Sequence, residues 1–327
     1  MTTAQLDWLS LEYGMFLHFG PNTFSGVAWG DGTFDPRSFA PDRLDCKQWA
    51  QIASDVGMRY AVLTAKHHDG FCLWRTKHTD YCVSSAAVSR DVVGEFVDAM
   101  RDAGIKPGLY YSLWDQNYPD YENDAAYAEF MQAQVSELLE NYGPIVELWF
   151  DGGWDKEHPT RRWEWKSEFA DSVDIEILRG CRWHWQELYD LIHAQQPDCL
   201  VVNNSSSDRP GIPRYHPVDV RTAEHFDFVM DGKRYVPEAG TEWTTHEGNP
   251  VSLPLEYCTS LNPDWFHIES KHFIHPSVAT IAGWRETARS SGANLLLNVG
   301  PDKRGLIPEV HSVYLREAAK RETIESL

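Results

Sequence analysis

Short apolar runs alternate with longer amphipathic stretches along most of this chain. The apolar runs predict buried strands, and apolar residues spaced by three and four positions predict helices with one packed face. We expect strands at 13–19, 59–66, 106–113, 146–151, 199–203, 256–260 and 293–299. We expect helices at 46–56, 91–103, 125–141, 183–195 and 277–291, several of them ended by glycine.

Repeated strand–helix units predict a parallel sheet with right-handed crossovers. The number of units favours a closed (β/α)8 barrel over an open sheet, and a length of 327 residues suits one barrel. Since neither a linker nor an internal repeat is visible, residues 1–327 are predicted to form a single domain. Two stretches, 155–182 and 204–254, interrupt the pattern, and both follow strand ends, where barrels carry variable loops.

The run VELWFDGGW, residues 146–154, ends a strand suited to burial with a carboxylate. Asp151 would then be displayed at the carboxyl end of a strand, where barrels place reactive groups, unless it only starts a turn before Gly152. The other predicted strands also end in polar or aromatic residues: His18, His67, His68, Asp69, Tyr110, Tyr111, Trp114, Asp115, Trp149 and Asn203. These side chains should converge on one rim.

The charge balance excludes one class of partner. Formal net charge is -20, with 29 basic against 49 acidic residues, which argues against nucleic-acid binding. A basic segment followed by an apolar stretch is missing at the N-terminus, and no run is long enough to span a membrane, so a cytoplasmic, non-membrane protein is expected. The six scattered cysteines are expected to be reduced thiols. A homo-oligomer is compatible with the sequence.

Three chemistries could use such a rim. Metal-assisted hydrolysis would take His18, His67 and Asp151 as ligands, but no familiar ligand spacing supports it, and adjacent His67 and His68 should point to opposite faces of a regular strand. A glycoside hydrolase would use two carboxylates without metal. A non-catalytic sugar-binding barrel would need the same aromatic residues alone. Neutral donors beside aromatic walls suit a carbohydrate, and no glycine loop suits a nucleotide, so we expect neither metal nor cofactor.

Five motifs identify a resemblance. GMFLHFGPNTF (14–24), LTAKHHDGFCLW (63–74), GLYYSLWD (108–115), ELWFDGGW (147–154) and ANLLLNVGPDKRG (293–305) together resemble the α-L-fucosidases of glycoside hydrolase family 29. The resemblance implies a catalytic (β/α)8-like barrel, a retaining mechanism and a terminal α-L-fucosyl group on an oligosaccharide or glycoconjugate as substrate. It places the nucleophile at Asp151. It places substrate contacts at His18, Trp29, His67, His68, Tyr111, Trp149 and Trp265.

The chain departs from the family pattern at three places. Many relatives carry Glu-Trp where this chain has Ala28 and Trp29, so one carboxylate contact is missing or supplied by Asp31. The family's Asn-Asp-Arg is replaced by Asn203, Asn204 and Ser205. The arginine then has only two candidate substitutes, Arg209 and Arg214. The family's C-terminal β-sandwich is not expected, because the sequence ends at Leu327.

The acid/base residue should lie beyond the strand ending near Asn203. The candidates are Glu224, Glu238, Glu242, Glu247 and Glu256. We favour Glu224, because DVRTAEHF (219–226) resembles the family segment that carries the acid. Glu256 in PLEYC is the second choice, and its alternative reading is a structural carboxylate at a strand start.

The charged insertion 155–182 should shape the leaving-group side of the site, since it follows the nucleophile's strand directly. Trp154, Trp163 and Trp165 could stack there on an aglycone sugar, unless they only pack the loop down.

Overall fold

The computed structural model describes residues 1–153, 180–204, 215–224, 228–230, 233–235, 242–245, 247–271 and 273–325. Its centre is a sheet of eight parallel strands in the spatial order β5-β4-β3-β2-β1-β12-β11-β6. The strands are β1 (Tyr13–Leu17), β2 (Tyr60–Lys66), β3 (Lys106–Ser112), β4 (Glu147–Asp151), β5 (Leu200–Asn203), β6 (Arg221–Glu224), β11 (Leu255–Ser260) and β12 (Asn294–Asn298). A parallel bridge between Val202 and Val220 joins the two outer strands, so the sheet forms a nearly closed barrel, as predicted.

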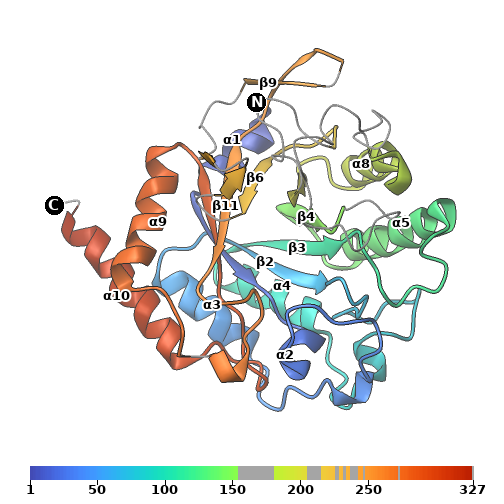
Figure 1. The fold of residues 1–327 in the computed structure, drawn as a ribbon, viewed down its shortest axis with the longest axis horizontal. Helices are drawn as coiled ribbons and strands as arrows, with labels where there is room; N and C mark the ends of the chain where they lie inside the picture. Colours follow the sequence, from blue (N-terminus) through green and yellow to red (C-terminus); the bar gives the residue numbers. More distant parts are fainter. Residues whose placement is uncertain are drawn as a thin grey trace.

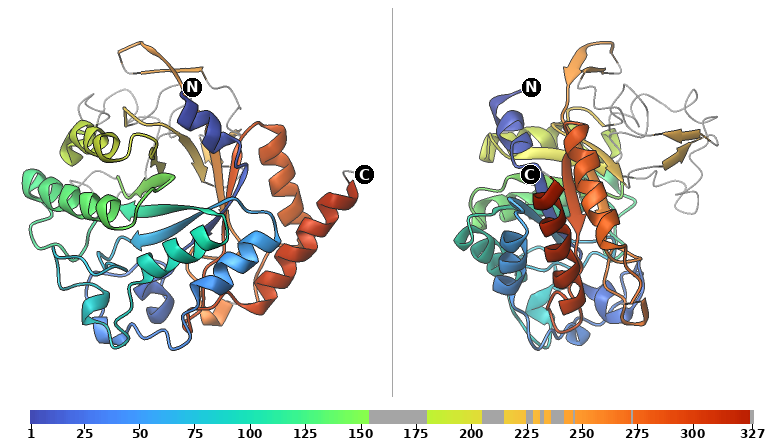
Figure 2. Two further views of the ribbon diagram at one scale, coloured as in Figure 1. Left: turned by 180° about the vertical axis from the view of Figure 1, so that it is seen from behind. Right: turned by 90° about the vertical axis from the view of Figure 1, so that its left-hand side faces the viewer.

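Helices surround this barrel (Figures 1 and 2). In chain order they are α1 (Thr3–Leu9), α2 (Pro21–Ser25), α3 (Cys46–Asp55), α4 (Val92–Asp102), α5 (Asp124–Asn141), α8 (Trp185–Gln195), α9 (Val278–Ser290) and α10 (Glu309–Glu325). Short 3-10 helices lie at Pro36–Ser38, Val83–Ser85, Cys181–Trp183 and Glu269–Lys271. Among the residues placed by the structure, no helix is both long and apolar enough to cross a membrane.

The outer helices form because their apolar residues recur on one face. In α4 the buried residues are Val92, Val93, Phe96, Val97, Ala99 and Met100, which follow the helical period and face the sheet. Asp91 begins this helix, and its side chain accepts a hydrogen bond from the backbone N–H of Gly94. The five predicted helices therefore appear as α3, α4, α5, α8 and α9, whereas α1, α2 and α10 were not predicted.

The eighth strand, β6, was not predicted, since it lies within the stretch 204–254 assigned to a loop. Its sequence RTAE lacks an apolar run, yet three of its four residues are buried. Arg221 is buried because its guanidinium stacks 4.6 Å from the ring centre of Trp243. The same stretch also forms two hairpins, β7 (Phe228–Met230) with β8 (Lys233–Tyr235) and β9 (Glu242–Thr244) with β10 (Pro250–Ser252). The β9–β10 hairpin projects beyond the barrel in Figure 1.

Two glutamates are buried together inside the barrel near the strand starts. Glu147 accepts a hydrogen bond from the Trp8 indole at 2.6 Å. Glu256 accepts one from the Trp149 indole and one from the Tyr60 hydroxyl, each at 2.8 Å. Burial raises the pKa of both carboxyl groups, and the charge of Glu256 raises the pKa of Glu147 further. Glu256 therefore occupies a structural position deep in the core.

This burial predicts how stability depends on pH. Burial raises the pKa of Glu256 from 4.5 to about 7. A carboxyl whose pKa is raised by folding stabilises the fold below its ordinary pKa, and that contribution is lost as the pH rises through about 7. We expect Glu256→Gln to gain on the order of 3 kcal/mol relative to wild type between pH 4.5 and pH 8, because glutamine has no such proton to lose.

Urea unfolding of both proteins at several pH values within this window measures the difference. Glu247→Gln, which alters an exposed glutamate, is the control for removing one carboxylate. A difference in unfolding free energy that does not change with pH would contradict the prediction.

Candidate active site

Asp151 ends β4 at the rim of the barrel, and both of its carboxylate oxygens are held. Oδ1 accepts hydrogen bonds from the Gly152 backbone N–H at 2.8 Å and from the Asn204 amide at 3.2 Å. Oδ2 accepts one from the Tyr110 hydroxyl at 2.9 Å and lies 3.7 Å from Nε2 of His68. The side chain keeps 17% exposure, so its charge remains accessible to a ligand.

Glycine after this aspartate is a local requirement. Gly152 has a φ of 72°, a conformation that residues with a side chain rarely adopt. A Cβ there would also lie 3.0 Å from Oγ of Ser112 and from Cβ of Trp114. The sharp turn that this glycine permits lets its own N–H reach the carboxylate of Asp151.

Glu224 ends β6 and reaches the same place. Its Oε2 accepts a hydrogen bond from the Asn204 amide at 2.9 Å, and its Oε1 accepts one from the Trp265 indole at 3.3 Å. The nitrogen of Asn204 therefore bridges Glu224 and Asp151. Two oxygens bonded to one nitrogen over 2.9 and 3.2 Å cannot be more than 6.1 Å apart.

Strand register separates the two leading acid candidates. Glu256 pairs with Thr222, whereas Glu224 pairs with Cys258, so Glu224 lies two residues nearer the carboxyl ends of the strands. Glu256 is fully buried. The structure thus groups Glu224 with Asp151 and leaves Glu256 in the layer beneath, which matches the alternative reading of Glu256 as a structural carboxylate.

Several other candidates do not join the rim or are not described. Glu247 is exposed, and Asp31 is exposed and accepts hydrogen bonds from Thr33. The following lie outside the described residues: Trp154, Trp163, Trp165, Arg209, Arg214, Glu238 and the side chain of Glu242.

Three histidines form one wall of the site. The ring centres of His67 and His68 are 3.9 Å apart, and those of His18 and His67 are 5.9 Å apart. The expectation that His67 and His68 point to opposite faces is wrong. Strand β2 ends at Lys66, and its register shifts between Thr64 and Lys66, so the regular alternation has already been broken.

Burial keeps two of these rings neutral. It lowers the pKa of His18 to about 3, against a smaller opposing effect from the hydrogen bond of 2.9 Å between its Nδ1 and Oδ1 of Asn298. Burial, with the neighbouring His68 and His18, also places the pKa of His67 well below its ordinary value. Nδ1 of His67 is buried and has no hydrogen-bond partner within the described part of the chain. A bound hydroxyl group would satisfy it.

The hydrogen bonds of Ser112 fix the tautomer of His68. The Ser112 hydroxyl donates its single hydrogen to the carbonyl oxygen of Trp114 at 2.7 Å. It must therefore accept from Nδ1 of His68, which lies 2.6 Å away. In the neutral ring, Nε2 is then an acceptor that faces the space beside Asp151, where it could receive a hydrogen bond from a sugar hydroxyl.

Aromatic side chains form the remaining walls. Trp149 stacks on Tyr110 with ring centres 5.6 Å apart, and Trp265 lies 5.1 Å from the ring of His18. Trp29 makes an edge contact with the ring of His68 at 5.6 Å. These three tryptophans are therefore at the predicted place.

Tyr111 is not in the site, contrary to expectation. Side chains alternate along β3, so Tyr110 points into the barrel and Tyr111 points away from it. The Tyr111 hydroxyl donates to Oε1 of Gln134 on α5 at 2.6 Å. Tyr110 is the residue that contacts Asp151.

Asn204 and Asn298 had no predicted role at the site, whereas Tyr110 and Trp114 were expected at the rim but not among the substrate contacts. Tyr110, Trp114 and Asn298 each lie at or near the end of a predicted strand, which was the signal that singled out Asp151. Asn204 immediately follows a strand. Only the three-dimensional contacts show that its amide joins two carboxylates.

Metal-assisted hydrolysis would need a group of metal ligands at the site. Within the ranges described above, no group of three or more His, Cys, Asp or Glu side chains is placed to hold a metal ion. His18 is instead paired with Asn298, and Asp151 with neutral donors.

Comparison with known proteins gives a consistent result. A family model described as Alpha-L-fucosidase matches residues 29–321. The chain is 35% identical to Alpha-L-fucosidase 1 of Arabidopsis thaliana over 97% of its length, and it spans 59% of that plant protein. The structure is similar to a glycoside hydrolase 29 family member from an unknown rumen bacterium (TM-score 0.76, 29% identity, 98% of this chain and 56% of that one). It is also similar to Alpha-L-fucosidase isoenzyme 1 from Paenibacillus thiaminolyticus (TM-score 0.74, 27% identity, 98% and 75%).

The burial of the histidines predicts their protonation. His18 should remain neutral from pH 8 down to about pH 5, because burial lowers its pKa to about 3. His67 should be neutral at pH 6.5, because burial places its pKa well below the ordinary value of 6.5. His18 should carry its hydrogen on Nδ1, since that atom faces a carbonyl-type oxygen of Asn298. Nitrogen NMR of protein labelled at histidine distinguishes neutral tautomers from imidazolium. An imidazolium signal for His18 at pH 6 would refute the burial argument.

Proposed function

Because this chain belongs to the α-L-fucosidase family, we propose that it is a retaining exo-α-L-fucosidase that hydrolyses terminal α-L-fucosyl groups of oligosaccharides or glycoconjugates. One observation carries the proposal. Asp151 and Glu224 meet at the carboxyl ends of the strands, where the amide of Asn204 bonds to both. Two carboxyl groups facing one neutral, aromatic pocket are what glycoside hydrolysis without metal requires.

In the proposed first step the carboxylate of Asp151 attacks the anomeric carbon. The bond to the leaving oxygen breaks as Glu224 gives that oxygen its proton, and a covalent glycosyl-enzyme results. In the second step the carboxylate of Glu224 takes a proton from water. The water oxygen attacks the anomeric carbon, which restores Asp151 and releases fucose with its original configuration.

The separation of the carboxylates supports retention over inversion. Retaining enzymes hold their two carboxyl groups about 5 to 5.5 Å apart, and inverting enzymes hold them about 6.5 to 9.5 Å apart to admit water. The oxygens of Asp151 and Glu224 that share the amide of Asn204 lie within 6.1 Å of each other. That leaves little room for a water molecule between sugar and base.

The pocket suits a 6-deoxy sugar. Such a sugar presents hydroxyl groups together with a methyl group. The neutral rings of His18 and His67 offer hydrogen-bond donors and acceptors without a charge that would have to be desolvated. The faces of Trp29 and Trp265 offer apolar area for the methyl group and the C–H face of the ring.

The rival function is a sugar-binding barrel without catalysis. It shares the histidine and tryptophan walls but does not need two carboxylates held by one amide. Measuring turnover of 4-nitrophenyl α-L-fucoside separates the two functions: binding of L-fucose without turnover on any aryl glycoside would favour the rival.

Replacing the nucleophile tests the first step. We expect Asp151→Asn to lower kcat for an aryl α-L-fucoside by at least about a thousandfold, because the amide cannot form the covalent intermediate. For the wild type, NMR of the first sugar released should show α-L-fucose. Initial release of β-L-fucose would mean inversion, and the role given to Asp151 would then be wrong.

Replacing the acid/base tests the second carboxyl group. Glu224→Ala should retain activity on an aryl fucoside with a good leaving group, which needs little protonation. It should lose about 10²- to 10⁴-fold on fucosylated oligosaccharides, the contribution usual for general acid catalysis. The fall of kcat/KM at high pH should also disappear.

Glu247→Ala is the matched control, because this exposed glutamate lies on the same connection between β6 and β11. It should behave as the wild type does on both substrates. If Glu256→Ala instead of Glu224→Ala showed the leaving-group dependence, the two glutamates would have to exchange roles.

A further inference from the structure

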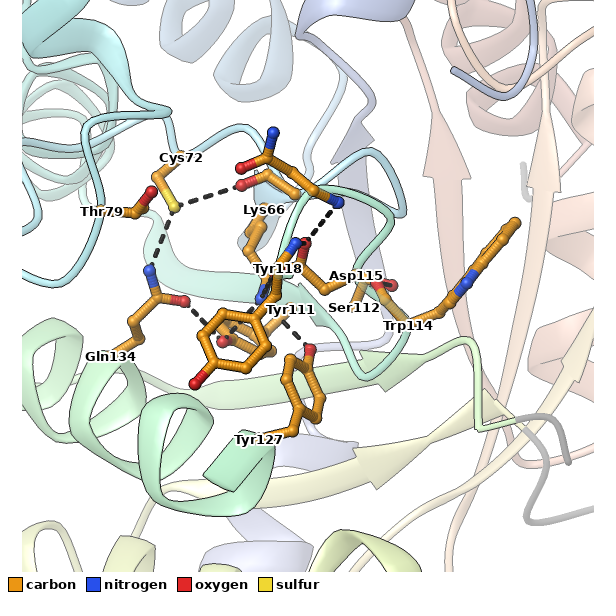
Figure 3. A network of polar contacts seen from close by, with 12 residues as sticks. Lys66, Cys72, Thr79, Tyr111, Ser112, Trp114, Asp115, Tyr118, Tyr127 and Gln134 are labelled. Atoms are coloured by element: carbon orange, nitrogen blue, oxygen red, sulfur yellow. Dashed lines mark hydrogen bonds and ion pairs between the residues drawn. The ribbon is translucent and has the colours of Figure 1, made fainter. Parts of the chain in front are cut away.

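A buried ion pair lies directly behind the site. Lys66, the last residue of β2, is fully buried and donates to Oδ2 of Asp115 at 2.8 Å. It also donates to the hydroxyls of Tyr111 at 2.8 Å and Tyr127 at 3.3 Å, which uses all three ammonium hydrogens. Figure 3 shows this cluster between the barrel and α5, with Trp114 pointing away from it.

Stability alone does not account for such a pair. Removing two charges from water costs several kcal/mol, and apolar residues of similar size are often equally stable in such positions. Buried pairs can instead fix one geometry among alternatives. Asp115 is the place to look for that geometry, because only one of its two oxygens contacts Lys66.

The second oxygen of Asp115 fixes the turn after β3. Oδ1 accepts hydrogen bonds from the backbone N–H groups of Asn117 and Tyr118, each at 2.9 Å. A Cβ on Gly70 would lie only 2.2 Å from this oxygen, so the chain after β2 packs tightly against the carboxylate. The ion pair therefore joins the connections that follow β2 and β3.

The turn after β3 also holds a second loop, which contains Gly30 and Gly32. The amide of Asn117 donates to the carbonyl oxygen of Gly32 at 2.8 Å, and the amide of Gln116 donates to that of Gly30. A Cβ on Gly32 would meet the backbone of Gln116 at 2.5 Å, so the two loops are in direct contact. Trp29 immediately precedes Gly30, the first residue that these hydrogen bonds hold.

Both loops deliver tryptophans to the pocket. The ring centres of Trp29 and Trp114 are 5.9 Å apart, and Trp114 lies 5.3 Å from the ring of His68. The backbone N–H of Gln116 also donates to the carbonyl oxygen of His68 at 3.0 Å. The positions of Trp29, Trp114 and His68 thus depend on the turn at 115–118, and that turn depends on Asp115.

We propose that Lys66 and Asp115 are positioning residues, which set the placement of Trp114 and Trp29 and thereby the affinity for the sugar without touching it. The effect on affinity rests on the proposed function. The effect on the two loops does not. Ala28 supplies no carboxylate beside Trp29, so we expect the aromatic contact of Trp29 to supply a larger share of the affinity for the sugar.

The test is a double variant, Lys66→Met with Asp115→Leu, which leaves no stranded charge. Hydrogen exchange followed by mass spectrometry should show faster exchange by about tenfold or more in peptides covering 28–34 and 113–118, with the barrel strands unchanged. With an aryl α-L-fucoside, KM should rise by about fivefold to tenfold, the size of a lost aromatic contact, while kcat changes less.

Glu137→Gln is the matched control. Glu137 is a buried carboxylate on α5 that accepts from the Trp74 indole at 2.8 Å and is not part of either loop. This variant should leave KM and exchange in both loops as in the wild type. A double variant that folds and shows wild-type loop exchange and KM would overturn the proposal, and so would exchange that is faster throughout the protein with an unchanged KM.

A second variant keeps the test decisive if the first does not fold. Gln116→Ala with Asn117→Ala preserves the ion pair and removes only the two amide contacts to Gly30 and Gly32. It should reproduce the faster exchange at 28–34 and the rise in KM, and wild-type values for both would refute the proposal. If the wild type neither hydrolyses nor binds fucosides, the proposed function fails, and the exchange measurements still decide whether Lys66 and Asp115 position the loops.

Discussion

The alternation of side chains along eight parallel strands is the constraint on which the site depends. Each strand can send only every second side chain into the barrel, and all strands end at the same rim. This rule pairs Trp149 with Tyr110 and Asp151 with Ser112 on neighbouring strands. It also sends Tyr111 outward to α5. Residues that are adjacent in sequence therefore have unrelated environments.

Charged groups in this barrel are stabilised in three different ways. Glu147 and Glu256 are buried together near the strand starts, where burial raises their pKa values and indole and phenol donors bond to three of their four oxygens. Lys66 and Asp115 compensate each other between the barrel and α5 (Figure 3). Asp151 and Glu224 remain partly exposed at the rim and share a neutral amide donor from Asn204. Only the last arrangement leaves carboxylates accessible to a ligand.

The neutrality of the surrounding histidines follows from the same packing. His18 and His67 are enclosed by aromatic rings, and the cost of burying a charge keeps them neutral. Neutral rings bind hydroxyl groups without competing for the negative charge of Asp151.

The sequence by itself determined the barrel, seven of its eight strands and the position of Asp151, because apolar runs with polar ends are local patterns. It did not reveal β6, whose charged Arg221 is buried against the ring of Trp243. It named Tyr111 where the structure places Tyr110, and it favoured Glu224 over Glu256 only by resemblance, since both choices depend physically on strand register and pleat. The link from Asn204 to both carboxylates joins residues far apart in the chain, so only the closing of the barrel could bring them together.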